Sequence, residues 1–287
     1  MKYLPLIMMA VLLLSVFASS FVMKFASAET GLVGYWKFDE GTGTTASDSS
    51  GNGNTGTLHN GSTWVNGKYG RALSFDGIDD YVEVLDSPEL NPSSITIMAW
   101  VSFRGFPPQG MYQWRNSMII SKGTDVHING HYCLFTQRVN EVLPYFQITE
   151  SSYWTWVEGA TNIVENQWYH LAGSYNGSVM KVYVNGVLEG EQSRNDPRTS
   201  NAGNLQIGAL RMLGEEYWTN GTIDEVKIYN RALSQQEIQI AMQPTVGGVV
   251  IPTDKFGLLA PYIGLASAVA VGAVIATVAA KQKKETK

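Results

Sequence analysis

Gly221-Thr222-Ile223-Asp224-Glu225-Val226-Lys227-Ile228-Tyr229-Asn230-Arg231-Ala232-Leu233-Ser234 is the stretch of this chain that says most about its fold. The run from Ile223 to Tyr229 is rich in β-branched residues, which favours a strand. Ser234 then stands at a helix N-cap, with Glu237 at the capping-box position and Pro244 beyond. The stretch therefore predicts a final strand followed by a short helix over residues 234–242.

The sequence upstream also predicts strands separated by tight turns. Asn and Gly tolerate the positive φ that tight hairpins need, and Asn-Gly pairs begin at Asn52, Asn60, Asn66, Asn129, Asn176, Asn185 and Asn220. Predicted strands include 33–38, 72–75, 81–84, 95–103, 118–121, 169–175, 180–184, 205–207 and 223–229. Many short strands with regular turns predict an all-β fold of two antiparallel sheets, each burying one face.

Further segments strengthen this prediction. They are Gly34-Tyr35-Trp36-Lys37-Phe38-Asp39-Glu40-Gly41, then Asp48-Ser49-Ser50-Gly51-Asn52-Gly53-Asn54-Thr55-Gly56, then Gly70-Arg71-Ala72-Leu73-Ser74-Phe75-Asp76-Gly77 continuing through Asp79-Asp80-Tyr81-Val82, and Trp168-Tyr169-His170-Leu171-Ala172 with Val182-Tyr183-Val184-Asn185-Gly186. In this order, together with residues 221–234, they resemble the laminin-G-like, concanavalin-A-like jelly-roll domains over residues 31–242. The resemblance implies a two-sheet sandwich with its first and last strands side by side. It also implies carbohydrate or protein ligands and a structural Ca²⁺, in a fold that hosts glycosidases as well.

The amino end predicts a signal peptide over residues 1–28. An apolar stretch runs from Leu4 to Val22, and Ala26-Ser27-Ala28 is the small-x-small pattern that precedes a cleavage site. An uncleaved signal anchor is the alternative, because the apolar stretch is long for a secretory signal.

The carboxyl end predicts a membrane helix over residues 256–280. This run has no charged, amide or histidine side chain and precedes the basic tail 281–287. About 20 residues of helix cross the bilayer core, and cationic flanks stay in the cytoplasm. A buried core helix is the alternative. The sequence thus predicts a single-pass cell-membrane protein with an extracellular domain and a linker over 243–255, where no strand pair is expected.

Small residues recur every fourth position in the predicted membrane helix, at Gly264, Ala268, Gly272, Ala276 and Ala280. Such a stripe lets helices approach closely, which predicts a homo-oligomer. Chance spacing in an Ala-rich span explains the pattern equally well.

The charge and cysteine content exclude some partners and stabilising devices. Residues 29–254 carry 24 acidic and 13 basic side chains. An acidic surface repels phosphate backbones, so no nucleic-acid partner is expected. Cys133 is the single cysteine, which excludes an intrachain disulfide.

Asp39 and Asp224 are the candidate calcium ligands, with Asp48 and Asn52 as weaker ones. Asp39 ends the first predicted strand, Asp224 lies on the last, and the family fold places these strands together. Ca²⁺ prefers carboxylate and carbonyl oxygens. The alternative is that Asp39 and Asp48 are ordinary turn formers that bind their own backbone. Asp76, Asp79 and Asp80 form a second acidic group, interpreted as a polar hairpin loop.

Five aromatic residues are the candidate ligand-binding side chains: Trp114, Tyr153, Trp154, Trp156 and Trp218. They lie in segments that match the family poorly. Trp154 and Trp156 share one face if their segment is extended. Exposed indoles stack on sugar C–H faces, and nearby carboxylates and amides bind hydroxyls. Packing inside the sandwich is the equally weighted alternative.

No catalytic motif is evident. Retaining glycosidases need two carboxyl groups about 5.5 Å apart, whereas the strand period places Asp224 and Glu225 on opposite faces. The sequence therefore favours a non-catalytic surface binding or adhesion module, with an extracellular glycan or glycoprotein as partner and membrane lipid around the C-terminal helix. A protein–protein adhesion or envelope-scaffold role and a glycan-active enzyme are the alternatives.

Overall fold

The computed structural model describes residues 30–106, 116–123, 131–138, 140–150, 153–194, 198, 202–212, 215–246 and 249–250. The chain divides into two units, Met1–Met242 and Gln243–Lys287. The predicted signal peptide (1–28), membrane helix (256–280) with its small-residue stripe, and basic tail (281–287) lie outside the described residues and stay predictions. Within the described ranges, no helix is long and apolar enough to cross a bilayer.

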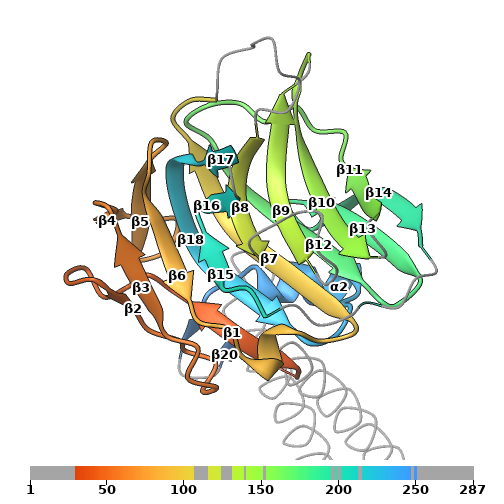
Figure 1. Ribbon diagram of the computed structural model, residues 1–287, viewed down its shortest axis with the longest axis horizontal. Coiled ribbons are helices and arrows are strands. Elements are labelled where there is room, and N and C mark those ends of the chain that lie inside the picture. Colours follow the sequence, from red (N-terminus) through yellow and green to blue (C-terminus); the bar gives the residue numbers. More distant parts are fainter. Residues whose placement is uncertain are drawn as a thin grey trace, which may run out of the picture. The chain divides into compact units, whose positions relative to one another are not determined.

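Two antiparallel sheets form the first unit, as predicted (Figure 1). The first sheet has the order β14-β13-β12-β7-β18-β5-β4, and β1 also pairs with β18. Its strands are β1 (Leu32–Trp36), β4 (Thr63–Asn66), β5 (Arg71–Asp76), β7 (Ile95–Phe103), β12 (Trp168–Tyr175), β13 (Val179–Val184), β14 (Val187–Ser193) and β18 (Asn220–Tyr229).

The second sheet has the order β11-β10-β9-β8-β15-β6-β3-β2. Its strands are β2 (Thr45–Ala46), β3 (Gly56–His59), β6 (Tyr81–Val84), β8 (Asn116–Lys122), β9 (His131–Arg138), β10 (Val142–Glu150), β11 (Tyr153–Glu158) and β15 (Leu205–Ile207). A short 3₁₀ helix, η1 (Pro88–Leu90), follows β6 in the chain. This is a jelly-roll sandwich.

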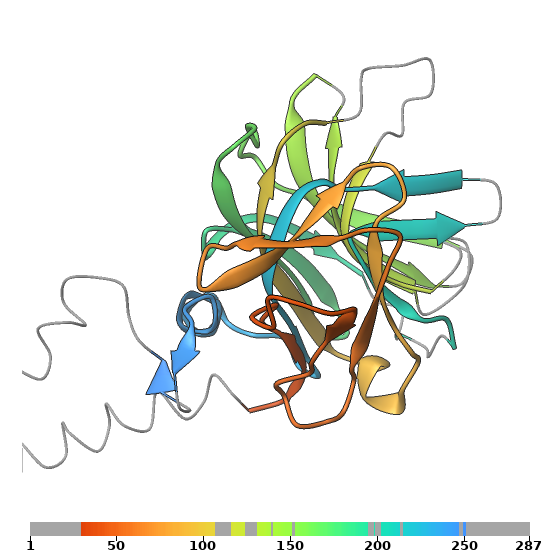
Figure 2. The ribbon, with the colours of Figure 1, turned by 90° about the vertical axis from the view of Figure 1, so that its left-hand side faces the viewer.

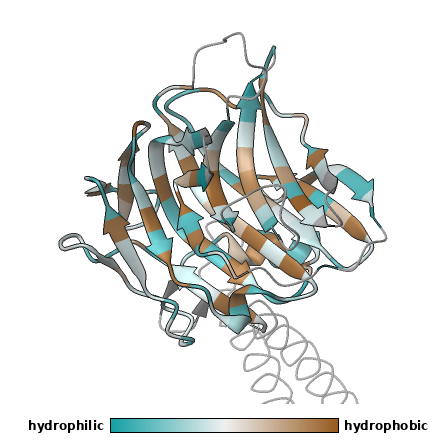
Figure 3. Cartoon of the chain, viewed as in Figure 1, coloured by the Kyte–Doolittle hydropathy of each residue, from teal (hydrophilic) through white to brown (hydrophobic). Residues whose placement is uncertain are grey.

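Side-chain alternation along the strands explains why the two sheets pack face to face. In β7, Ile97, Ala99 and Val101 belong to the main core, whereas Met98 and Trp100 point to the other face. Apolar and polar bands alternate along many strands in Figure 3. Each sheet therefore has an inner face buried in the core and an outer face with its own chemistry.

Strand β18 changes its partner halfway along. Its first half pairs with β5, as in Ile223↔Leu73, and its second half pairs with β1, as in Val226↔Trp36. Between these halves the register against β7 shifts, and Glu225 adopts a φ of 52°. A β-bulge inserts one extra residue and bends the strand. The bulge lies where the last strand takes the first strand as its neighbour.

The helix α2 (Gln235–Ala241) forms as predicted, because Ser234 and Glu237 make a complete capping box. Its carboxyl end is also capped: the Lys227 Nζ donates to the Ala241 carbonyl at 2.6 Å, and the Trp100 Nε1 donates to the Met242 carbonyl at 2.9 Å. Carbonyls at a helix end otherwise lack partners. These bonds hold α2 on the outer face of the first sheet.

Two small hairpins complete the described structure. Strands β16 (Ala209–Met212) and β17 (Glu215–Trp218) form a hairpin in the first unit; Figure 2 shows these two short strands projecting from the sandwich. In the second unit, β19 (Thr245–Val246) pairs with β20 (Val249–Val250). The expectation of no strand pair in 243–255 was wrong, because Thr245 pairs with Val250 and Val246 pairs with Val249. The β-branched side chains of these four residues favour strands.

His170 is a buried histidine on the outer face of the first sheet. It is 1% exposed and meets the Trp100 ring edge-on at 5.4 Å between centroids. Neither ring nitrogen has a hydrogen-bond partner among the described residues. Burial lowers the pKa of His170 to about 3, and the Lys227 charge adds to the effect. The imidazole is therefore neutral in the folded protein at neutral pH.

This burial predicts a pH dependence of stability. Because the folded pKa of His170 is below its unfolded value, its contribution is complete above pH about 6.5 and is lost as pH falls toward 3. The loss approaches about 1.4 kcal/mol per pH unit. A His170→Phe variant shows a shallower decline in the free energy of unfolding, measured with urea between pH 7 and pH 4. Identical declines in the two proteins would contradict this assignment.

Candidate functional site

The outer face of the second sheet carries the polar and aromatic side chains that alternate along its strands with the core residues. Phe146, Ile148 and Val157 point into the core. The residues between them, Gln147 on β10 and Trp156 on β11, point outward and are paired in register. Two groups of side chains lie on this face: the Trp156 group (Trp156, Glu158, Tyr145 and Phe135) and the Tyr81 group (Tyr81, His59, Arg211 and Trp218).

The Trp156 group lies on the edge strand β11. Trp156 is 43% exposed and is the one aromatic among the large exposed hydrophobic residues of the described chain. Glu158, two residues along the same strand, accepts a hydrogen bond from the Tyr145 hydroxyl at 2.8 Å. Tyr145 is stacked on Phe135, with ring centroids 5.3 Å apart. The carboxylate of Glu158 is therefore held beside an exposed indole.

The pKa of Tyr145 favours its hydrogen bond to Glu158. Burial raises the pKa of the Tyr145 hydroxyl, and the neighbouring Glu158 raises it further. The phenol therefore stays protonated and remains a donor at neutral pH. One Glu158 oxygen takes that bond, and the exposed carboxylate has acceptor capacity left for another molecule.

Of the remaining candidate aromatics, only Trp218 has a described side chain. Tyr153 and Trp154 lie on β11, paired in register with Glu150 and Thr149, and their side chains are outside the described part. Trp114 also lies outside the described residues. Trp218 is half-buried at the end of β17 and belongs to the Tyr81 group, not to the Trp156 group.

The Tyr81 group joins strands that are distant in sequence. His59 of β3 stacks on the Tyr81 ring of β6, with centroids 4.5 Å apart and an interplanar angle of 10°. The Arg211 guanidinium lies 5.0 Å from the same ring centroid, and its Nη1 donates to the Tyr81 hydroxyl at 2.7 Å. The Trp218 ring is tilted against Tyr81 at 6.1 Å.

The bulge in β18 changes the position of the paired carboxylates. Asp224 pairs in register with Trp100 on the outer face, and Glu225 also reaches that face, where its Oε2 accepts from the Tyr35 hydroxyl at 2.5 Å. The expectation that Asp224 and Glu225 point to opposite faces was wrong, because the bulge breaks the period of two. Both are buried, at 0% and 4% exposed.

Asp39 and Asp224 both bind the turn that joins β4 and β5. The Asp39 Oδ1 accepts from the Arg71 amide at 2.8 Å, and the Asp224 Oδ2 accepts from the Tyr69 amide at 3.0 Å. The Asp224 Oδ1 has no hydrogen-bond partner in the described part. Burial raises the pKa of Asp224 to about 8, and Glu225 adds to the rise. An orphaned buried carboxylate oxygen is a suitable cation ligand.

Asp48 and Asn52 do not fit a cation in the same way. The Asp48 carboxylate accepts from the backbone amides of Tyr35, Ser50 and Asn54 at 2.8–2.9 Å. The Asn52 side-chain amide donates toward the Leu32 and Val33 carbonyls. These contacts are those of turn formers that attach the 48–54 loop to β1.

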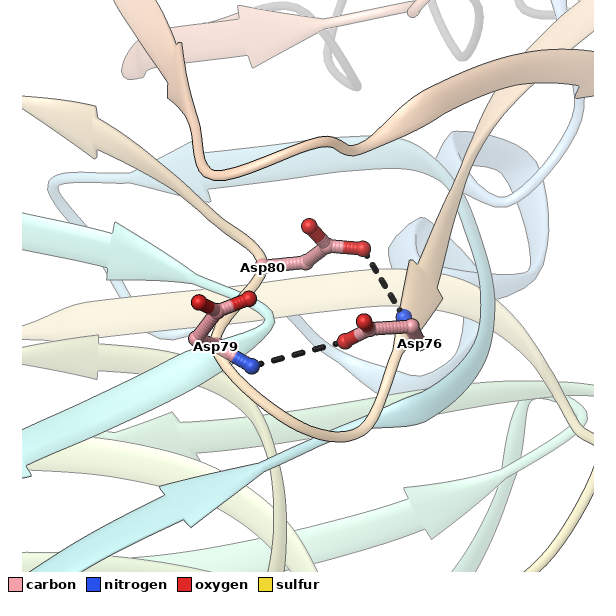
Figure 4. A group of neighbouring side chains, drawn as sticks. All are labelled: Asp76, Asp79 and Asp80. Carbon is pink, nitrogen blue, oxygen red and sulfur yellow. Dashed lines mark hydrogen bonds between the residues drawn. The ribbon is translucent and has the colours of Figure 1, made fainter.

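Asp76, Asp79 and Asp80 offer ligand atoms within 4.8 Å of one another (Figure 4). Their contacts are those of a polar turn. The Asp76 Oδ1 accepts from the Ile78 amide at 2.8 Å, and the Asp80 Oδ2 accepts from the Asp76 amide at 2.9 Å. Burial raises the pKa of Asp80, and the charges of Asp76 and Asp79 contribute.

Sequence reasoning missed the roles of Tyr145, His59, Tyr81 and Arg211. The Tyr145–Glu158 contact had a local signal, because adjacent strands β10 and β11 place these residues opposite each other. The Tyr81 group had none, since Arg211 is 130 residues from Tyr81 and the contact depends on the sheet topology.

Comparison with known proteins identifies the family of the fold. The sequence profile of the concanavalin A-like lectin/glucanases superfamily matches residues 76–239. No curated protein sequence gives a significant match.

Solved structures share the architecture. Domain 4 of AbnA, a GH43 extracellular arabinanase from Geobacillus stearothermophilus in complex with arabinotriose, matches with a TM-score of 0.57 and 21% identity, over 74% of this chain and 98% of that one. A structure of botulinum neurotoxin type C, whose cell entry depends upon interaction with two ganglioside molecules, matches with a TM-score of 0.59 and 15% identity, over 75% and 51%. Trypanosoma rangeli sialidase matches with a TM-score of 0.54 and 18% identity, over 73% and 32%. The chain thus spans about half of the toxin structure and a third of the sialidase. At these identities the likeness shows the fold alone.

Proposed function

The chain belongs to the concanavalin A-like lectin/glucanases superfamily, and we propose that its sandwich is a non-catalytic carbohydrate-binding module. The observation that carries the proposal is the exposed indole of Trp156 beside the held carboxylate of Glu158. A flat apolar ring covers the C–H face of a sugar, while a fixed carboxylate accepts hydrogen bonds from its hydroxyls. Holding Glu158 in place before binding lowers the entropy lost when the ligand arrives.

The structural relatives support this proposal. The arabinanase domain is in complex with arabinotriose, and the cell entry of the toxin depends upon gangliosides. Both share the sandwich, although at identities that carry no residue-level inference.

The position of the carboxylate pair supports a non-catalytic role. Asp224 and Glu225 are buried on the outer face of the first sheet. A polysaccharide has no access to either group, so the pair is not available as the acid and nucleophile of a glycosidase.

Asp39 and Asp224 are the residues we propose to hold a structural Ca²⁺. They bind the same β4–β5 turn, and the orphaned Asp224 oxygen fits a cation ligand. The ion would neutralise a buried carboxylate and stabilise the junction of the first and last strands.

The sequence of the two termini supports placing the module at a cell surface, attached by residues 256–280 to the membrane that carries it.

Trp156→Ala is expected to weaken glycan binding by roughly 30-fold, because truncating a central aromatic contact costs about 2 kcal/mol or more. Leu85→Ala is the matched control, since Leu85 is a large residue that is 71% exposed. Binding of the full chain is measured on a glycan array and then by calorimetry, with circular dichroism to check folding. Wild-type affinity in Trp156→Ala would refute this site; binding to proteins but no glycan would favour the adhesion or scaffold alternative.

Calcium is expected to raise the melting temperature of the full chain, because a ligand at 100 times its Kd stabilises the folded state by about 2.7 kcal/mol. Asp39→Asn and Asp224→Asn each abolish this rise, whereas Asp79→Asn retains it. The absence of both binding heat and a thermal shift in the wild-type protein would end the calcium proposal.

Protease added to intact cells is expected to digest the sandwich and leave the tail 281–287 protected, because the basic tail resists translocation. Detection of the undigested sandwich in the cytosolic fraction would contradict this topology.

A further inference from the structure

The Tyr81 group has the chemistry of a second binding site on the same face. Trp218 is half-buried, and the side chains of Arg211 and Glu216 are 43% and 50% exposed. Tyr81 is covered by its neighbours and 5% exposed, so it supports the surrounding rings instead of contacting a ligand. The partly exposed Trp218 ring therefore shares this surface with the hydrogen-bonding side chains of Arg211 and Glu216.

The contacts of Arg211 fix its position but do not use all of its N–H donors. Its backbone amide donates to the Gln206 side chain at 3.0 Å, and its Nη1 donates to the Tyr81 hydroxyl. Its Nε lies 3.6 Å from the Glu216 Oε1. A guanidinium has five N–H donors in a fixed plane, so donors remain for hydroxyls of a ligand beside Trp218.

The two groups are too far apart for one sugar ring. Trp156 lies on β11 and Tyr81 on β6, five strand intervals away in the order β11-β10-β9-β8-β15-β6. At about 4.8 Å per interval the separation is roughly 24 Å. The β16–β17 hairpin, which supplies Arg211 and Trp218 to the Tyr81 group, extends over the intervening strands, since Leu210 and Tyr217 pack in a cluster with Phe135 and Tyr145.

We propose that the Tyr81 group is a second glycan site, and that the ligand is a neutral polysaccharide long enough to occupy both sites. This inference rests on the proposed function and adds the ligand class to it. Two sites on one rigid face bind a single polymer with avidity, without any further contact.

The charges at both sites favour a neutral polymer. Arg211 is paired with Glu216, and the His59 Nε2 lies 3.7 Å from the Glu83 Oε2. The Trp156 group adds the carboxylate of Glu158. In the part of the chain that the structure describes, neither group has a cationic side chain without an acidic neighbour. Residues 29–254 as a whole carry 24 acidic and 13 basic side chains. A chain of uronates or sialylated units meets repulsion here.

The test measures binding of the full chain to arabinan, xylan, mannan and glucan, each as the polymer and as its trisaccharide. For the sugar that binds, the polymer is expected to bind at least about 100-fold more tightly than its trisaccharide. The polymer concentration is expressed as the concentration of segments long enough to reach both sites. Trp156→Ala and Trp218→Ala each reduce polymer affinity to the trisaccharide level. Arg211→Gln is the second variant, because its exposed side chain can be replaced if Trp218→Ala does not fold.

Equal affinity for polymer and trisaccharide would overturn the two-site inference, as would wild-type polymer binding in both Trp218→Ala and Arg211→Gln. In either case the Trp156 site and the proposed function stand. Failure of the wild-type protein to bind any glycan, neutral or charged, would overturn both the inference and the proposed function. Binding confined to sialylated or uronate polymers on the array would overturn the neutral-ligand assignment alone.

Discussion

The bulge at Glu225 lets the last strand of the sandwich pair with two different neighbours. Strand β18 must pair with β5 in its first half and with β1 in its second, while β7 occupies its other edge. The extra residue provides the bend and brings Asp224, Glu225 and Lys227 to one face. Lys227 then reaches both the Glu225 carboxylate, at 3.3 Å, and the end of α2. Removing one partner of such a buried ion pair typically costs about 3–5 kcal/mol, so the network holds the two ends of the domain in one arrangement.

The two outer faces have different roles. The outer face of the first sheet is covered by α2 and by the β4–β5 turn, and its ionisable groups make structural contacts. The outer face of the second sheet keeps an exposed indole, a held carboxylate and the Tyr81 group. Rigid strands fix the spacing of these groups better than loops would, which favours recognition of an extended and regular ligand.

Local sequence predicted the elements whose periodic pattern is uninterrupted. The predicted ranges 81–84, 95–103 and 205–207 coincide with β6, β7 and β15, and the capping box at Ser234 begins the helix. Strands β10 and β11 were missed as a pair, in part because Pro144 interrupts the strand pattern of β10. The positions of Asp224 and Glu225 were wrong because a period of two assumes a strand without a bulge. The Tyr81 group was not predictable from local pattern, since sheet order alone joins β3, β6 and the β16–β17 hairpin.

If ligands bind the outer face of the second sheet, they slow hydrogen–deuterium exchange in its strands and in the hairpin that packs on it. The exchange of the full chain is measured with and without the polysaccharide that binds best. We expect slower exchange in β11 and in the β16–β17 hairpin, with α2 and β12 to β14 unchanged. Slower exchange confined to α2 and β14, or to the 48–54 loop, would show that the ligand binds elsewhere.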